Sequence, residues 1–353
     1  MTRVRARGEE VRKFILQNLE KHPNEIAKIA AEKFGVTRQA INKHLQRLVT
    51  EKAITELGKT RNRTYQMATL SEWNKAYLIA PGLAEDTVWR EDVRPALGEM
   101  PDNVIGIWQF GFTEIFNNAL DHAGAKGIHV KVEKTAIATT INIYDDGIGI
   151  FKKIQDTLGL MDERHAVLEL SKGKLTTDPK KHSGEGIFFA TRMFDEFSIL
   201  SGSVYFSHKI DYKHDYALET GKEQATGTSI YMTLNNHTSR TTKKVFDQFT
   251  DAEEFTFSKT IVPVELARYG DENLVSRSQA KRLLGRVEKF KTVMFDFTDV
   301  PTIGQAFADE IFRVFQNQHP DIKLIPVSYN AEIGQMIERA LSGGAETKPS
   351  AAS

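Results

Sequence analysis

The stretch from Glu114 to Ile150 constrains the fold and chemistry of this chain more than any other. Its first half is typical of an amphipathic helix, because one face would carry Phe110, Glu114, Asn118 and Asp121 at spacings of three and four. A single acid on a helix is usually solvated surface. An acid and an amide four residues apart, with Asp and His one turn later, instead predict a stripe that holds a metal ion and a water.

The second half of this stretch predicts two antiparallel strands that end in a glycine turn. Residues 127–144 are rich in β-branched side chains. Asp145, Gly147 and Gly149 follow directly. Glycine lets the backbone approach a ligand, and the acid accepts hydrogen bonds. Together the two halves predict a nucleotide site.

The composition excludes several kinds of chemistry. At 353 residues the chain is long enough for two or three domains. It contains no cysteine, which excludes disulfides, thiolate zinc sites and thiol catalysis. No apolar run approaches the roughly 20 residues that span a bilayer, and the N-terminus lacks the apolar core of a signal peptide. We therefore expect a cytoplasmic protein that does not enter a membrane.

Residues 1–69 are predicted to form a basic DNA-binding domain. Residues 1–67 hold 15 Lys and Arg but seven Asp and Glu, although the whole chain has no net charge. This asymmetry favours a partner that is a polyanion. Three helical segments, the third capped by Thr37 and running to about Glu51, precede a hairpin with a basic tip. The order resembles a winged helix-turn-helix.

The expected contacts with double-stranded DNA fall into two groups. The polar face of the third helix offers donors to base edges through Arg38, Gln39, Asn42 and Lys43. The tip of the hairpin would bind phosphates through Lys59, Arg61 and Arg63. Two alternatives stay open, a merely solvated helix face and a winged helix that contacts protein.

Residues 70–102 are predicted to be a connector that prolines break into short pieces. Its apolar side chains, including Trp73, Tyr77 and Trp89, need to be buried. Either the next domain or a second subunit would cover them, so the sequence leaves a homodimer open.

The middle domain, residues 103–236, carries two further glycine motifs. Residues 151–183, with lysines clustered near their end, are predicted to form a mobile lid. Gly184 and Gly186 then open an apolar helix, whose first backbone N–H groups are suited to phosphate. Gly227 and Thr228 enter the last strand of the domain.

In this order the motifs resemble the GHKL superfamily, the Bergerat-fold ATP-binding domain of gyrase, heat-shock chaperone, histidine kinases and mismatch-repair ATPases. The resemblance rests on Glu114 with Asn118, Asp145-x-Gly147-x-Gly149, Gly184-x-Gly186 and Gly227-Thr228. It implies an α/β sandwich of Bergerat type that binds ATP and Mg²⁺.

The resemblance also implies roles for the matching residues. Glu114 would be the catalytic base that orients the attacking water, Asn118 would bind Mg²⁺, and Asp145 would accept the adenine amino group. The remaining cofactor-binding residues would flank the phosphates, the lid or the base: Asp121, Gly147, Gly149, Lys181, Gly184, Gly186 and Thr228.

Residues 237–341 alternate strands and helices, which predicts a small α/β domain. The stretch from Asp296 to Gly304 resembles a STAS-like domain, the fold of anti-anti-sigma factors. Those factors carry a phosphorylatable serine at a helix start. Gly304-Gln305-Ala306 has no hydroxyl at that place, so we expect no such switch, but we do expect a protein partner for this domain. Residues 342–353 are predicted to be a disordered tail.

These features together predict an α/β multidomain protein. The preferred function is an ATP-binding and ATP-hydrolysing regulator, in which a GHKL nucleotide switch controls a DNA-binding winged helix-turn-helix. One alternative is a GHKL protein kinase of the anti-sigma type that acts on a partner protein. Another is an ATP-binding module without hydrolysis. No paired-helix phosphoacceptor region precedes Phe110, since His22 and His44 fall in the N-terminal domain.

Overall fold

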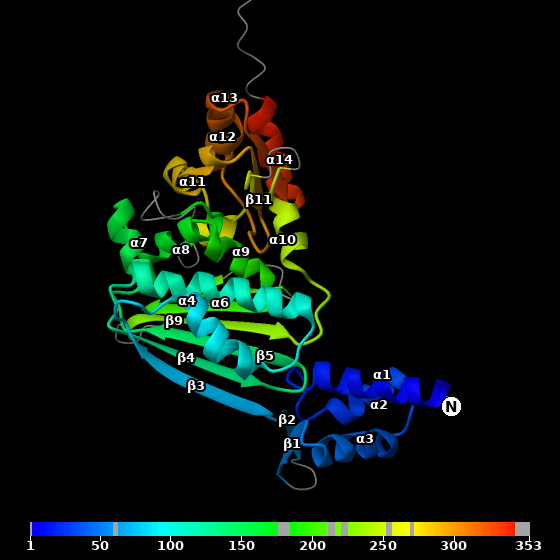
Figure 1. Cartoon of the computed structure of the whole chain (residues 1–353). Helices are drawn as coiled ribbons and strands as arrows, with labels where there is room; N and C mark the ends of the chain where they lie inside the picture. The colour runs from blue at the N-terminus through cyan, green and yellow to red at the C-terminus, as the bar shows by residue number, and fades with distance from the viewer. Residues whose placement is uncertain are drawn as a thin grey trace, which may run out of the picture.

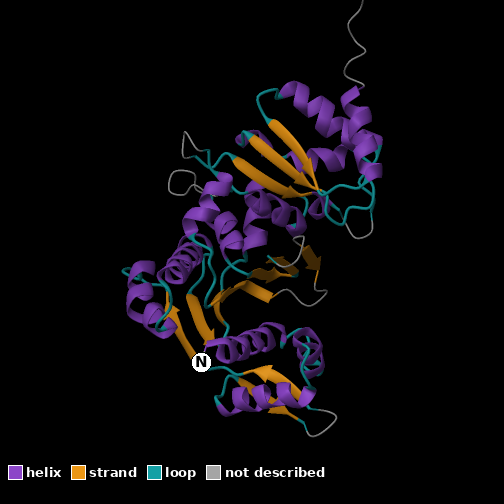
Figure 2. Cartoon of the chain, turned by 90° about the vertical axis from the view of Figure 1, so that its right-hand side faces the viewer, coloured by secondary structure: helices purple, strands orange, loops and turns teal. Residues whose placement is uncertain are grey.

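The computed structural model describes residues 2–58, 63–175, 184–210, 216–219, 225–251, 256–268 and 272–342. Over these residues the protein is mixed α/β and contains three sheets. A helical N-terminal unit lies beside the end of the largest sheet. The C-terminal unit lies beyond the helices that cover that sheet (Figures 1 and 2).

The N-terminal unit consists of three helices and a hairpin. They are α1 (Thr2–Asn18), α2 (Ile26–Phe34), α3 (Arg38–Thr50), β1 (Ile54–Leu57) and β2 (Thr64–Met67), and β1 and β2 are antiparallel. The Thr37 hydroxyl oxygen accepts from the backbone N–H of Ala40 at 3.2 Å, which confirms the predicted cap. Ile15, Ile41 and Leu45 belong to an apolar cluster separate from the rest of the core.

The segment predicted as a connector belongs to the large sheet. It forms β3 (Ser71–Leu78), α4 (Glu85–Val88), the π-helical turn η2 (Trp89–Val93) and α5 (Arg94–Leu97). Strand β3 pairs antiparallel with β4 (Gly127–Lys134) along its whole length. Tyr77 and Trp89 are buried in the same cluster as Phe112 of the following helix. The aromatic residues are therefore covered within the chain.

The large sheet has seven strands in the order β3-β4-β5-β9-β6-β7-β8, and all neighbours are antiparallel. Its further strands are β5 (Ala138–Asp145), β6 (Glu196–Gly202), β7 (Val204–Lys209), β8 (Tyr216–Glu219) and β9 (Ala225–Asn235). The last strand in sequence, β9, lies between β5 and β6. This insertion pairs Asp145 with Thr228, although 82 residues separate them in the sequence.

Helices cover one face of this sheet. They are α6 (Asp102–His122), α7 (Ile150–Leu158), α8 (Glu163–Lys172) and α9 (Gly186–Met193). Helix α10 (Thr242–Phe249) packs against α6 and α9. Figure 1 shows α6 running along the strands, with α7, α8 and α9 on the side toward the C-terminal unit. The pattern of β5 explains the arrangement, since Ile141 and Ile143 are buried while Tyr144 is exposed.

The described part of the stretch predicted as a mobile lid, residues 151–175, is mostly helical, and its mobility stays a prediction. Helices α7 and α8 occupy most of residues 150–172, and seven consecutive residues at the end of α8 are buried. Two of the buried side chains are the charged Glu169 and Lys172. The remaining part of the predicted lid, residues 176–183, lies outside the described residues.

The C-terminal unit contains a parallel sheet in the order β10-β11-β12. Its strands are β10 (Lys259–Pro263), β11 (Thr292–Asp296) and β12 (Lys323–Val327). Its helices are η3 (Val264–Ala267), α11 (Arg277–Leu284), η4 (Val287–Lys289), α12 (Gln305–Asp309), η5 (Glu310–Phe315), α13 (Gln316–Gln318) and α14 (Ala331–Ser342). Ser276 and Gln279 form a capping box at the start of α11. The apolar core of this unit is continuous with that of the seven-stranded unit.

The N-terminal unit and the connection that follows it contact the β4–β5 hairpin. Ala136, at the tip of the β4–β5 hairpin, packs against the N-terminal apolar cluster. The backbone N–H of Leu70, just before β3, donates to the carbonyl oxygen of Lys134 at 2.7 Å. The short connection between β2 and β3 is thus anchored to the sheet.

Candidate functional site

A cavity of about 290 Å³ lies between α6, the ends of β5 and β9, and the starts of α7 and α9. Many of the residues predicted for the nucleotide site form its wall: Glu114, Asn118, Asp145, Gly149, Gly184, Gly186 and Thr228. The sheet order explains this gathering, because β9 brings Thr228 beside Asp145. Residues from four separate motifs therefore share one cavity.

Helix α6 supplies the polar stripe of the cavity. Glu114, Asn118 and His122 line it at successive spacings of four, which keeps them on one side of the helix. Asp121 does not line the cavity and is exposed near the end of α6. Its spacing of three from Asn118 turns it toward solvent, so the expected place in the stripe belongs to His122.

Asp145 is a buried carboxylate in the wall, with 6% of its surface exposed. Its Oδ1 accepts from the backbone N–H of Gly147 at 2.9 Å. Burial raises the pKa of Asp145, and hydrogen bonds from the backbone of Gly147 and Thr228 oppose that rise only in part. A donor brought by a ligand would improve the surroundings of this carboxylate.

The glycines of the second motif allow close approaches of the backbone. A Cβ on Gly147 would lie 2.3 Å from the carbonyl oxygen of Ala123, so Gly147 packs behind the wall without lining it. Gly149 has a φ of +90°, and a Cβ there would lie 2.7 Å from the Ser201 hydroxyl. Directly after it, the backbone N–H of Ile150 donates to the Thr228 hydroxyl at 3.0 Å.

The glycine turn before α9 approaches the acidic stripe. A Cβ on Gly186 would lie 1.9 Å from Oε2 of Glu114, so any larger residue there would displace the Glu114 carboxylate. Gly184 has a φ of +71° and packs against the backbone of Leu175. Lys181, predicted to bind the cofactor, lies outside the described residues.

Several wall residues escape the motif search. Lys153 lines the cavity and donates from Nζ to the carbonyl oxygen of His122. Leu170 and Leu175, from the predicted lid, also line it. Helical spacing from Gly149 would find Lys153, since Ile150, Lys153 and Ile154 share one side of α7. The remaining apolar lining comes from Ile115, Ala119, Ala123, Ile143, Ile187 and Ile230.

The predicted DNA-contacting side chains of α3 lie on one surface. Arg38, Gln39, Asn42 and Lys43 are all exposed, while Ile41, Leu45 and Leu48 of the same helix are buried. On the hairpin, Arg63 forms an ion pair with Glu56 at 2.9 Å. Lys59 and Arg61 lie outside the described residues.

Two general features bear on ligands and environment. Among the described residues, no three His, Cys, Asp or Glu side chains are grouped as they would be to hold a metal ion by themselves. In the same residues, none of the helices combines the length and apolar character needed to cross a bilayer.

Comparison with known proteins bears on the C-terminal unit. A search of curated proteins found no match to the chain. Residues 279–333 match the model of a family described as a STAS-like domain of unknown function (DUF4325). The matched residues run from α11 into the start of α14 and include β11 and β12. The C-terminal part of this chain is thus STAS-like.

Proposed function

We propose that the cavity binds ATP with Mg²⁺ and that the protein is a nucleotide-controlled, DNA-binding regulator. One observation carries the proposal. The acid and amide of α6, the buried Asp145 with Thr228, and the glycine turn at α9 surround one cavity. This set of groups has the order that resembles the GHKL, or Bergerat-fold, ATP-binding domain.

The chemistry of the wall fits an adenine nucleotide. The apolar side chains Ile143 and Ile230 flank Asp145, which suits a flat base whose amino group donates to a carboxylate. The first backbone N–H groups of α9 and the ammonium of Lys153 suit phosphates. Acid, apolar surface and anion-binding groups thus occur in one cavity.

The polar stripe of α6 would serve the reactive end of the nucleotide. Asn118 would hold Mg²⁺, which neutralises charge on the phosphates when it is bound. Glu114 lies one helical turn away on the same wall and would orient a water for hydrolysis. At the same position Glu114 would also serve transfer of the phosphate to a hydroxyl of a partner protein. Phosphate release measures hydrolysis, and phosphorylation of a partner measures this transfer.

The N-terminal unit supports the DNA-binding half of the proposal. Its three helices and hairpin resemble a winged helix-turn-helix, and α3 presents a polar, exposed face. Arg63 would exchange its partner Glu56 for a phosphate on binding. The STAS-like unit would contact a protein partner.

Calorimetry with the full chain tests the nucleotide site. We expect Mg-ATP to bind the wild type, and we expect Asp145→Asn and Asn118→Ala to weaken it by about 100-fold or more, the size of a lost charged hydrogen bond or metal ligand. Asp146→Asn is the matched control. The Asp146 carboxylate accepts from the backbone N–H groups of Lys126 and Gly127 and does not line the cavity. Equal ATP affinity in Asp145→Asn and wild type would refute the site.

Hydrolysis is tested separately from binding. Glu114→Ala should still bind Mg-ATP but release no phosphate, because the water would lose its orienting base. Phosphate release that is unchanged in Glu114→Ala would remove this role. ATP binding by the wild type with neither phosphate release nor phosphorylation of a partner would favour the non-hydrolysing module.

DNA binding by the full chain tests the regulatory half. We expect binding to duplex DNA that weakens steeply with salt and that differs between no nucleotide, ADP and a non-hydrolysable ATP analogue. Lys43→Ala should reduce binding, whereas Lys33→Ala, on the exposed side of α2, is the control. DNA affinity that changes with neither salt concentration nor nucleotide would refute the proposal of nucleotide-controlled DNA binding.

A further inference from the structure

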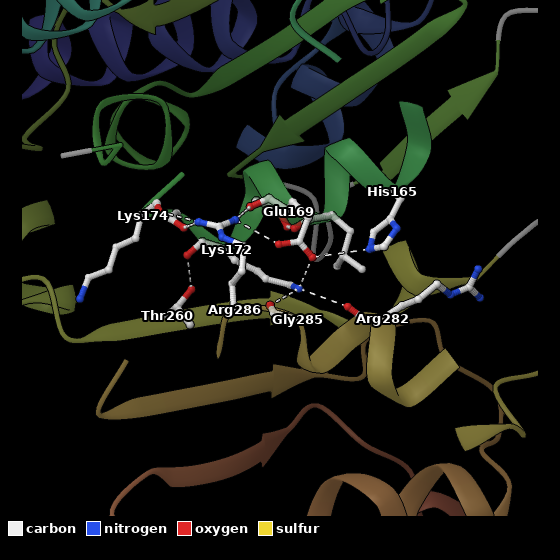
Figure 3. Close-up of polar contacts among 11 residues, drawn as sticks. His165, Glu169, Lys172, Lys174, Thr260, Arg282, Gly285 and Arg286 are labelled. Carbon is white, nitrogen blue, oxygen red and sulfur yellow. Dashed lines mark hydrogen bonds and ion pairs between the residues drawn. The ribbon is translucent and has the colours of Figure 1, made fainter. Parts of the chain in front are cut away.

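A buried ionic cluster joins α8, whose Leu170 lines the cavity, to the STAS-like unit (Figure 3). Glu169 and Lys172, both on α8, have side chains that are 3% and 0% exposed. Their Oε1 and Nζ atoms are 2.6 Å apart. Lys172 also donates to the carbonyl oxygens of Gly285 at 2.7 Å and Arg282 at 3.3 Å. Two hydrogen bonds of this lysine therefore join α8 to the end of α11, and its third bonds Glu169 within α8.

Arg286 reaches into the cluster from the opposite side. It follows α11 and has a φ of +62°, a conformation that a residue with a side chain seldom adopts. Its guanidinium donates to Oε2 of Glu169 at 3.0 Å and to the carbonyl oxygens of Gly173 and Lys174. Arg286 thus satisfies carbonyl groups just beyond the C-terminus of α8.

Two more contacts fix the same short segment. The Thr260 hydroxyl of β10 donates to the carbonyl oxygen of Lys172 at 2.7 Å. The Lys174 ammonium donates to the carbonyl oxygen of Lys289 at 2.8 Å and lies 4.9 Å from the Phe290 ring centroid. Residues 172–174 are therefore held by β10 and by the turn around η4.

The segment continues directly into the cavity wall. The backbone N–H of Leu175 donates to the carbonyl oxygen of Gly184 at 3.0 Å. Leu175, Gly184 and Gly186 all line the cavity, and Gly186 closely approaches Glu114. A continuous series of contacts leads from Arg286 to the acid of α6.

We infer that Arg286, acting with Glu169 and Lys172, is a positioning residue for nucleotide binding, by which the STAS-like unit holds one wall of the cavity in place. The inference rests on the proposed ATP site. Because coupling is reciprocal, a nucleotide that orders this wall also tightens the junction between α8 and the STAS-like unit. A protein that binds the STAS-like unit near η4 would thereby change nucleotide affinity.

The test compares Arg286→Ala with Arg313→Ala in the full chain. Arg313 bonds Asp309 within the STAS-like unit, and no hydrogen bond or ion pair from it to α8 occurs among the described residues, so it matches the loss of charge. Calorimetry with Mg-ATP separates affinity from the number of sites. We expect Arg286→Ala to raise the Kd about tenfold at an unchanged number of sites, a typical coupling. Arg286→Lys should recover part of the affinity.

A merely structural role would instead lower the number of binding sites and leave the Kd of the folded molecules unchanged. That outcome, or an equal Kd in Arg286→Ala and Arg313→Ala, overturns the inference.

Amide hydrogen exchange without nucleotide tests the positioning role of Arg286 independently of ATP binding. Arg286→Ala should speed exchange at Leu175, whose N–H bonds Gly184, while Arg313→Ala should not. If the wild type binds no ATP, the proposed function fails. If ATP binds but exchange at Leu175 is unchanged in Arg286→Ala, the positioning role alone fails.

Discussion

Asp145 and Glu169 are two buried carboxylates with opposite surroundings. Glu169 faces His165, Lys172 and Arg286. Asp145 accepts hydrogen bonds from backbone and hydroxyl groups, and no ion pair to it occurs among the described residues. Burial raises the pKa of Asp145. For Glu169, burial acts in the same direction, but the His165 hydrogen bond and the charges of Lys172 and Arg286 outweigh it and lower the pKa to about 2.

The difference separates a charge used by the fold from a charge available to a ligand. A carboxylate surrounded by cations stabilises its own region and has little to gain from a new donor. A buried carboxylate that accepts hydrogen bonds only from neutral groups is stabilised further by one more donor. Burial alone identifies neither role, and the partners of each acid decide between them.

Of the variants that test this difference between the two acids, Lys172→Met should change the free energy of unfolding most. It leaves Glu169 buried without its closest partner, and breaking such a pair costs about 3–5 kcal/mol of unfolding free energy. Urea denaturation measures the loss. Lys243→Met is the control, since Lys243 pairs with Asp247 on the exposed side of α10 and should change stability little. A loss of the same size in both variants would contradict the assigned role of the cluster.

The acid dependence of stability should follow Glu169. Its folded pKa of about 2 lies below the ordinary 4.5. Its stabilising contribution is therefore complete above pH 4.5 and is lost as the pH falls toward 2. The loss amounts to roughly 3 kcal/mol, given about 1.4 kcal/mol for each pKa unit. Glu169→Gln should remove this part of the pH dependence in urea titrations at pH 2 to 7. An identical pH dependence in the variant would show that Glu169 is not its source.

Asp145→Asn should have a smaller effect of opposite sign on the protein without nucleotide. Because the folded pKa of Asp145 is raised, the folded state binds its proton more tightly, and stability falls as the pH rises through that range. A neutral amide removes this cost, so we expect a gain on the order of 1 kcal/mol, as at other functional sites.

Thermal melting without nucleotide measures that gain. Asp146→Asn should melt lower than the wild type, since the pKa of Asp146 is lowered by hydrogen bonds from the backbone of Gly127 and Lys126. If Asp145→Asn and Asp146→Asn both melt lower than the wild type, the proposed difference between an acid that awaits a ligand and an acid that stabilises the fold is refuted.

The sequence was most informative where chemistry depends on short spacings. Glu114 and Asn118 are four residues apart on one helix, and Asp145 and Gly149 belong to one turn, so local geometry places each pair. The cap at Thr37 was predictable for the same reason. Asp121 was misplaced because the stripe continues at a spacing of four, to His122.

Long-range partners explain what the sequence could not predict. Lys172 fell within the predicted lid, because the groups it contacts in the STAS-like unit, Gly285 and Arg282, are more than 100 residues away. The edge strand β3 was likewise missed, since its pairing with β4 depends on how the 48 residues between them fold, most of which are helical. Periodicity reports which face of an element is buried but not what covers it.

Strand β5 runs from the N-terminal unit to the cavity. It begins two residues after Ala136, which contacts the N-terminal cluster, and it ends at Asp145 in the cavity. Its eight residues span roughly 25 Å at about 3.3 Å each, and β4 and β9 brace it on both sides. A braced strand transmits a tilt without bending. Helix α3 lies beyond the other end of β5, so a slight rotation of β5 about its end at the cavity would displace α3 by a larger distance.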